Sequence, residues 1–246
     1  MSRLVAVQAH RGSPDPAAGI EENTVSAFLR AARLGADGVE LDVRLTGDGA
    51  LAVHHDPQIV GRGPIGALAV RELPDHVPLL AAALAAVDGL TVNIEIKNLP
   101  TEPGFDPDER VARLVVELLD DERREAPVVI SSFWPGSLDA VRVAAPHLAT
   151  GLLLADWADP ATGVDMAVDA GYRALHLHHS LVSATVVDAA HQAGLAVAAW
   201  TVNGSEAVAA MAASRVDTVI TDDVLGTAAT LEAVDGPADA GGHRAL

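Results

Sequence analysis

The 246-residue sequence contains no cysteine, which excludes disulfide bonds and thiolate metal sites. Basic residues are few: 16 Lys and Arg stand against 34 Asp and Glu, a formal net charge of −18. Nucleic acid is therefore not an expected partner, because binding its phosphates requires a basic surface. The acidic composition is compatible with a divalent cation, and an anionic substrate would have to meet local positive charge.

Long hydrophobic runs are also missing. No apolar stretch approaches the roughly 18 residues of a membrane span, and the first predicted strand begins near Leu4, which leaves no room for a signal peptide. We therefore expect a cytoplasmic protein without a stable membrane anchor. No interface patch stands out, so the sequence assigns no oligomeric state.

What the sequence does have is enough apolar material for one large domain, since half of its residues are hydrophobic. We expect this domain to span residues 1–232. Residues 233–246 are rich in glycine, alanine and aspartate and lack a hydrophobic period, so we expect them to form a disordered tail.

Short apolar strands alternate with helical segments. Helices are predicted after an Asn23–Thr24 cap and at 79–87, 107–120, 137–144, 161–170, 183–193 and 205–213; strands are predicted at 5–9, 38–43, 91–97, 128–131, 151–154, 174–177, 195–201 and 217–220. This α/β alternation predicts a parallel sheet, and eight strands predict a single (βα)8 TIM-type barrel. An open doubly wound sheet is the alternative, but no G-x-G-x-x-G follows the first strand.

A β-hairpin excursion follows the second strand. The turn at 46–49 (Thr-Gly-Asp-Gly) joins residues 43–45 to residues 51–53. The hairpin should bring Asp42 close to His54 or His55. Residues 58–78 contain several glycines and prolines and are predicted to be irregular.

Charged side chains and histidines gather at predicted strand ends, which share one rim of a barrel. They are His10, Arg11, Glu40, Asp42, His55, Asp56, Glu95 and Lys97. Carboxylates that share a rim would repel each other, so a hard divalent cation, Mg²⁺ or Ca²⁺, is expected among them. Zinc is disfavoured, because no H-E-x-x-H pair is present. The alternative for Glu40-x-Asp42 is the solvated face of a strand.

The two histidines are suited to proton transfer. His10 and His55 would serve as an acid/base pair at a phosphate, although a structural role is the alternative for either one. Arg11 and Lys97 supply positive charge for phosphate oxygens. His54 alternates to the other strand face, and His178 and His179 are interpreted as structural or substrate-side neighbours.

Three further residues have two interpretations each. Glu22 either fixes Arg11 through an ion pair or interacts with a helix dipole. Asn23 is interpreted as a helix cap in preference to a ligand. Trp200 either forms an apolar wall for a glycerol-sized group or packs in the core.

The residues resemble the glycerophosphodiester phosphodiesterase family. The resemblance rests on motifs in family order from about residue 5 to residue 225: His10-Arg11-Gly12, Glu22-Asn23-Thr24, Glu40-Leu41-Asp42-Val43, His55-Asp56, Glu95-Ile96-Lys97, Ser132-Phe133, Trp200-Thr201-Val202-Asn203 and Thr221-Asp222.

This resemblance implies a barrel that hydrolyses glycerophosphodiesters to glycerol 3-phosphate and an alcohol. It implies a metal held by Glu40, Asp42 and Glu95, and His10 and His55 as the general acid/base pair. It also implies that Arg11 and Lys97 contact phosphate. The glycerol 2-hydroxyl could attack phosphorus first and give a cyclic phosphate.

Two alternatives stay open. The first is a phospholipase D-like barrel acting on lysophospholipids or sphingolipids, although no amphipathic basic helix provides a route to a membrane. The second is a barrel that only binds phosphate or metal. The second ranks low, because the full set of acid/base histidines and carboxylates is present.

Overall fold

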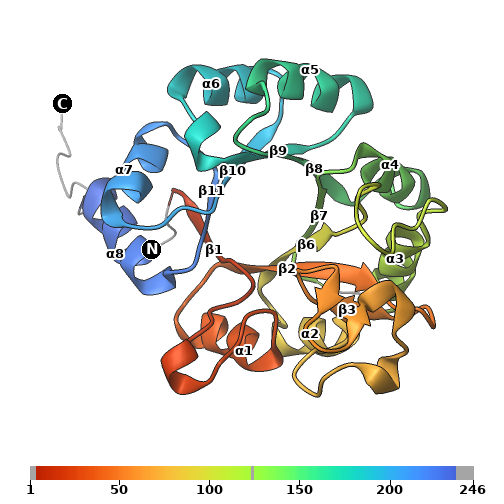
Figure 1. The fold of residues 1–246 in the computed structure, drawn as a ribbon. Helices are drawn as coiled ribbons and strands as arrows, with labels where there is room; N and C mark the ends of the chain where they lie inside the picture. The colour runs from red at the N-terminus through yellow and green to blue at the C-terminus, as the bar shows by residue number, and fades with distance from the viewer. Residues whose placement is uncertain (1–3, 123–124, 237–246) are drawn as a thin grey trace, which may run out of the picture.

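In the computed structural model, eight parallel strands close into a barrel surrounded by helices (Figure 1). The structure describes residues 4–122 and 125–236. The barrel strands are β1 (Ala6–Ala9), β2 (Gly38–Leu45), β6 (Thr91–Ile96), β7 (Val128–Ser132), β8 (Ala149–Leu154), β9 (Ala174–His178), β10 (Ala196–Trp200) and β11 (Thr218–Thr221). β1 pairs in parallel with both β11 and β2. The TIM-type barrel is thus confirmed, and an open sheet is excluded.

Helices follow the barrel strands, as the alternation predicts. They are α1 (Val25–Arg33), α2 (Leu80–Ala86), α3 (Arg110–Glu122), α4 (Pro135–Ala144), α5 (Pro160–Ala170), α6 (Ala184–Gln192), α7 (Ser205–Ala213) and α8 (Val224–Asp235). The sequence analysis did not predict α8, whose residues form no clean apolar stripe: Leu231 is buried, but Leu225 is 57% exposed. α8 includes residues 233–235 of the expected tail, and residues 237–246 lie outside the described part of the chain.

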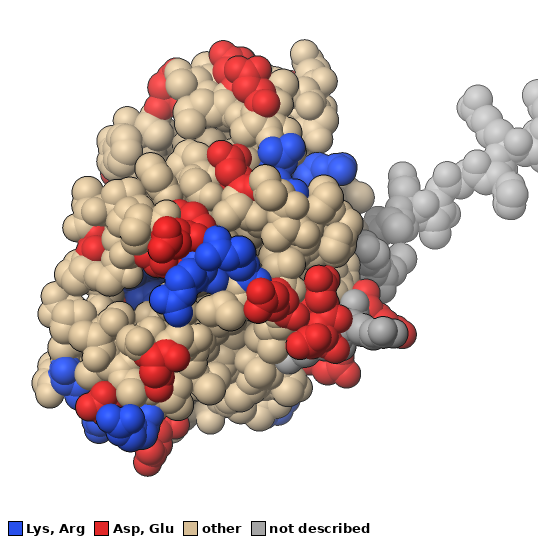
Figure 2. Space-filling view, turned by 90° about the vertical axis from the view of Figure 1, so that its right-hand side faces the viewer, with Lys and Arg blue, Asp and Glu red and all other residues tan. Residues whose placement is uncertain are grey.

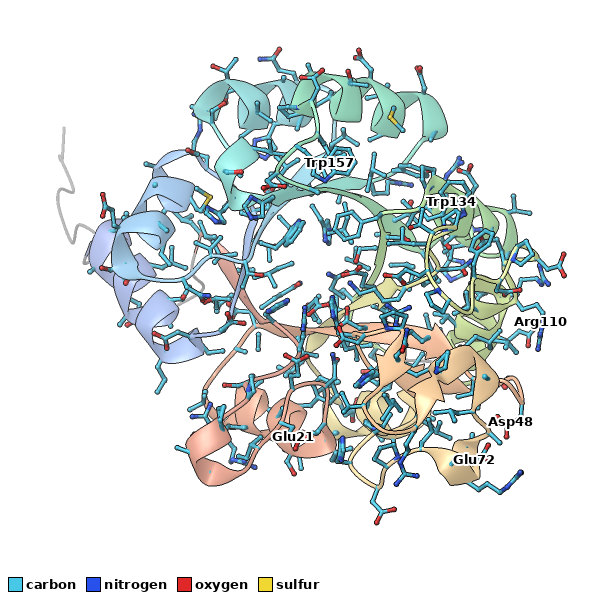
Figure 3. The ribbon with its side chains drawn as sticks, in the orientation of Figure 1. Glu21, Asp48, Glu72, Arg110, Trp134 and Trp157 are labelled. Atoms are coloured by element: carbon cyan, nitrogen blue, oxygen red, sulfur yellow. The ribbon has the colours of Figure 1, made fainter. Side chains whose placement is uncertain are left out.

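The two faces of β2 explain where the core and the site lie. Val39, Leu41 and Val43 belong to the hydrophobic core. Glu40 and Asp42 alternate with them and are buried as well, because the opposite face of a barrel strand points into the interior. Side chains of the strands project into the space that the barrel encloses (Figure 3). The polar face of β2 therefore points inward.

The hairpin excursion is present. β3 (Leu51–Val53) pairs antiparallel with the end of β2. The segment after it is more ordered than predicted: it contains β4 (Gln58–Ile59), β5 (Gly63–Pro64) and two 3-10 helices, Ile65–Ala67 and Val70–Glu72. The reason is a small apolar core of its own, made of Ala52, Ile59, Ile65, Leu68, Leu73 and Val77. At the hairpin turn, the Asp48 carboxylate (Figure 3) accepts a hydrogen bond from Val70 N–H.

Figure 2 shows the face at the right of Figure 1, where acidic and basic side chains are interspersed. Among the described residues, no helix combines the length and the apolarity needed to cross a bilayer.

Candidate active site

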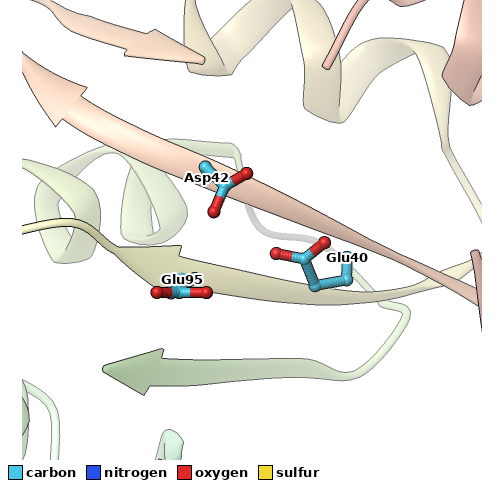
Figure 4. A group of neighbouring side chains, drawn as sticks. All are labelled: Glu40, Asp42 and Glu95. Atoms are coloured by element: carbon cyan, nitrogen blue, oxygen red, sulfur yellow. The ribbon is translucent and has the colours of Figure 1, made fainter. Parts of the chain in front are cut away.

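Strand register brings three carboxylates together. Asp42 on β2 lies directly opposite Glu95 on β6, and Glu40 precedes Asp42 by two positions on the same strand face. Each offers an oxygen within 4.8 Å of the others, and all three residues are buried (Figure 4). The solvated-strand interpretation of Glu40-x-Asp42 is therefore wrong, because a barrel strand has no solvated face here.

The charge in this cluster is only partly compensated. Lys97 Nζ lies 2.6 Å from Glu95 and 3.2 Å from Asp42. Burial would raise the pKa of Asp42, but the charges of Lys97, His55 and Arg11 hold it below its usual value. Burial and the neighbouring Asp42 raise the pKa of Glu40 to about 8. Buried carboxylate oxygens with excess negative charge fit a hard divalent cation.

His10 has a carboxylate partner that the sequence analysis missed. Its Nδ1 lies 2.7 Å from Asp222 Oδ1, and a carboxylate only accepts, so Nδ1 carries the proton. Asn203 Nδ2 in turn donates to Asp222 Oδ2 (2.6 Å). Burial lowers the pKa of His10, but Asp222 and the charge of Glu40 outweigh burial and raise it overall. The Thr221-Asp222 motif contained this partner without revealing its contact.

His55 is held differently. Its Nδ1 lies 2.7 Å from Oδ1 of Asp56, the next residue in the chain. Burial and the charge of Lys97 lower the pKa of His55. The two histidines therefore have pKa values displaced in opposite directions, a pattern that separates the tasks of two proton-transfer groups. As predicted, the hairpin places this segment beside Asp42: His54 N–H donates to the Asp42 carbonyl (3.0 Å).

Arg11 lies on a sharp turn after β1. It has a φ of 51° and is followed by Gly12 with a φ of 80°, a backbone shape that glycine tolerates. The Arg11 backbone N–H donates to Glu40 (2.8 Å), and its guanidinium donates to Glu22 (2.8 Å). The ion-pair interpretation of Glu22 is the correct one, because α1 begins only at Val25.

Asn23 corrects the sequence interpretation. The helix cap is Thr24, whose hydroxyl accepts from Ala27 N–H (3.2 Å). Asn23 instead points at the carboxylate cluster: its Nδ2 donates to Asp42 Oδ2 (2.7 Å), and its Oδ1 accepts from Asp42 N–H (3.2 Å). Two neighbouring residues of cap type are indistinguishable in sequence, and only the position of β2 reveals that Asn23 faces Asp42.

These side chains line one cavity of about 200 Å³ at the strand ends: His10, Arg11, Glu40, His55, Asn93, Glu95, Lys97, Phe133, Leu153, Trp200 and Ile220. Asp42 and Glu22 are not among the lining residues, but both contact the Arg11 guanidinium, at 3.5 and 2.8 Å. The cavity has two sides. The charged groups and histidines lie on β2 and β6 or shortly after β1, β3 and β6, whereas Phe133, Leu153 and Trp200 form an apolar wall.

Trp200 is fixed in this wall. Its indole N–H donates to the His176 carbonyl (2.9 Å), and its ring meets Phe133 edge to face with centroids 5.6 Å apart. His178 packs edge-on against the same ring at 5.3 Å and pairs with Ser180, in agreement with a supporting role. The arrangement combines cationic side chains, two histidines with carboxylate partners and an apolar surface around one cavity.

Comparison with known proteins agrees with this geometry. The family model of the glycerophosphoryl diester phosphodiesterase family matches residues 10–225. A glycerophosphodiester phosphodiesterase of Caldanaerobacter subterraneus subsp. tengcongensis is 33% identical, over 88% of this chain and 93% of the relative. A second, from Bacillus altitudinis, is 30% identical, over 89% of this chain and 95% of the relative.

Solved structures share the fold. A phosphodiesterase of Oleispira antarctica, determined with sn-glycerol-3-phosphate, superposes with a TM-score of 0.83 at 24% identity, covering 93% of this chain and 97% of its own. A glycerophosphodiester phosphodiesterase of Thermotoga maritima gives a TM-score of 0.74 at 27% identity, with 92% and 97% covered. With its barrel, its carboxylate cluster and its ordered motifs, this chain belongs to the glycerophosphoryl diester phosphodiesterase family.

Proposed function

We propose that this protein is a metal-dependent phosphodiesterase that hydrolyses glycerophosphodiesters to glycerol 3-phosphate and an alcohol. The observation that carries the proposal is the cavity itself, where two histidines, two cationic side chains and a buried three-carboxylate cluster meet. Relatives of 30% and 33% identity over most of the chain have this activity in their names, which supports the same reaction here.

Glu40, Asp42 and Glu95 would hold Mg²⁺ or Ca²⁺. A bound cation of this kind supplies positive charge to phosphate oxygens and stabilises the charge that develops there. Arg11 presents a guanidinium fork to the same phosphate, and Glu22 keeps that fork in place. Lys97 adds a second cationic group on the cavity wall.

The two histidines would divide the proton transfers. Each uses Nδ1 for its carboxylate partner, so Nε2 is the nitrogen available to the substrate. One Nε2 accepts the proton of the attacking hydroxyl. Attack by water gives glycerol 3-phosphate directly, whereas attack by the glycerol 2-hydroxyl gives a cyclic phosphate that water then opens in a second step. The other donates a proton to the oxygen of the departing alcohol, so that the alcohol leaves neutral. Asp222 and Asp56 keep both rings in the required tautomer.

The apolar wall suits the carbon skeleton of the substrate. Trp200 and Phe133 both line the cavity, with their rings packed edge to face. A glycerol group placed there would exclude water from that side of the phosphate. A phosphate between the cationic groups and this wall would lie within reach of both histidines.

The test is glycerol 3-phosphate release from a panel of glycerophosphodiesters in chelator, then with Mg²⁺ or Ca²⁺ restored. We expect turnover only with metal, and none from His10→Ala or His55→Ala. An activated substrate with a nitrophenyl leaving group identifies the proton donor, because its departure needs no acid, so the donor variant regains activity. No release from any panel member, together with hydrolysis of a lysophospholipid, would overturn the proposed substrate class.

A further inference from the structure

The strands on either side of β2 both end before the residues that the proposed reaction uses. β3 ends two residues before His55, and β6 ends one residue before Lys97. Backbone pairing with β2 continues one step on each side: His54 N–H donates to the Asp42 carbonyl, and Lys97 N–H donates to the Val43 carbonyl, both at 3.0 Å. The side chain of the next β2 residue then contacts both segments.

That residue is Arg44, whose side chain is buried. Its Nε donates to the His55 carbonyl at 2.7 Å. Its Nη1 donates to the Lys97 carbonyl in a longer contact of 3.5 Å. A single guanidinium therefore links the backbone of a proton-transfer residue to that of a phosphate-binding residue 42 positions away (97 − 55 = 42).

Glu102 neutralises and orients this guanidinium. Glu102 lies in the loop between β6 and α3, and its Oε2 accepts a hydrogen bond from Arg44 Nη1 at 2.7 Å. The same loop packs closely on the excursion: a Cβ at Gly66 would lie only 2.9 Å from Cα of Gly104. Arg44 and Glu102 thus lie at the seam between the barrel and the excursion that follows His55. The Arg44 side chain is 7% exposed and that of Glu102 is 25% exposed, so loss of Glu102 would leave a buried guanidinium without its carboxylate.

We propose that Arg44, held by Glu102, is a positioning residue that sets His55 and Lys97 relative to each other at the cavity. The inference rests on the proposed function, which assigns proton transfer to His55 and phosphate binding to Lys97. Arginine suits this task because its donors lie in one rigid plane, whereas lysine carries a point charge on a flexible stem. Arg44 is neither a lining residue of the cavity nor a member of the carboxylate cluster. It reaches the lining residues His55 and Lys97 only through their backbone carbonyls.

The test compares Arg44→Met and Arg44→Lys with Arg215→Met, which removes an arginine from an exposed pair with Asp188. A displacement of His55 of about 1 Å lowers kcat about 100-fold, so we expect a loss of that size in Arg44→Met. KM should rise by less, because the contact to the Lys97 carbonyl is the longer of the two. Arg44→Lys should restore only part of kcat, and Glu102→Gln should lose less than Arg44→Met. If Arg44→Met and Arg215→Met have the same kcat per folded molecule, the inference is wrong.

A second readout does not need turnover. In ¹⁵N-histidine NMR, the His55 ring signals are assigned by their absence in His55→Gln. We expect Arg44→Met to shift and broaden them while the His10 signals stay as in the wild type. If Arg44→Met shows this response but the wild type hydrolyses no glycerophosphodiester, the positioning is supported and the proposed function is refuted. An unchanged His55 signal in an active enzyme would overturn the positioning alone.

Discussion

Nδ1 of His10 lies 2.7 Å from Oδ1 of Asp222, although 212 positions separate the two residues in the sequence. The contact follows from barrel closure. β1 pairs with β11, with Ala9 opposite Thr221, so the residue after each strand meets the residue after the other. The last strand of the barrel thus supplies the carboxylate for the histidine at the end of the first.

Asp222→Asn should displace the pH dependence. Asp222 counteracts burial and raises the pKa of His10, so its loss lets His10 release its proton at lower pH. The limb of the pH–rate profile governed by His10 should move to lower pH, whether His10 is acid or base. The loss in kcat should be about 100-fold, within the usual range for proton-transfer groups.

The matched comparison for that profile is Asp56→Asn, which removes the partner of His55. The Asp56 side chain is 70% exposed, against 50% for Asp222, so solvent should screen its effect more. An Asp222→Asn profile that coincides with the wild type would show that this carboxylate does not control His10.

Asn23→Ala should weaken the carboxylate cluster. The substitution removes both hydrogen bonds to Asp42 and leaves a buried acceptor unsatisfied, at a cost of about 1–3 kcal/mol in the free energy of unfolding. Cation affinity should fall as well, because Asp42 loses its orientation. Chemical denaturation and a calorimetric titration with Ca²⁺ measure the two effects.

Thr24→Ala is the control, because it removes the true helix cap and costs about 1 kcal/mol. It should leave cation affinity unchanged. Equal losses of affinity in both variants would mean that Asn23 acts only through local stability.

A divalent cation should stabilise the fold. A ligand that binds only the native state raises the free energy of unfolding by about 2.7 kcal/mol at a hundredfold excess over its dissociation constant. We expect Mg²⁺ or Ca²⁺ to raise the melting temperature of the wild type, and chelator to reverse the rise. A rise of the same size in Asp42→Asn and in Glu95→Gln would locate the cation elsewhere.

Trp200→Ala should open the apolar wall. The substitution removes the ring that packs against Phe133, and the loss of an aromatic contact of about 1.4 kcal/mol would lower kcat/KM about tenfold. Trp200→Phe keeps a ring but leaves the His176 carbonyl without the indole donor. It should therefore lose stability and retain most of kcat/KM. Steady-state kinetics measures the effect on kcat/KM, and thermal denaturation measures the effect on stability. Equal kcat/KM for both variants would contradict the role of Trp200 in the apolar wall.

The architecture and most residues of the candidate site could be predicted from the amino-acid pattern alone. The alternation of eight apolar strands with helices predicted the barrel. Such a pattern can be found in the sequence because hydrophobic period and spacing are local properties of the chain. Polar residues placed just after those strands indicate a shared rim, because the carboxyl ends of parallel strands meet. β2 carries Glu40 and Asp42 in alternation with Val39, Leu41 and Val43. This alternation indicates one apolar and one polar face, because successive side chains of a strand point to opposite sides.

The contacts between the polar groups could not be predicted, because they depend on how the whole chain folds. Asp222 contacts His10 because the barrel closes, and Asn23 contacts Asp42 across a loop. Arg44 contacts the backbone of His55 and Lys97, and no periodic pattern in the sequence indicates these contacts. α8 was not predicted from the sequence because it has no clean apolar stripe. A helix of small residues can pack on the barrel without one. Pairing between distant residues depends on the register of strands and the packing of loops, which are set when the whole chain folds.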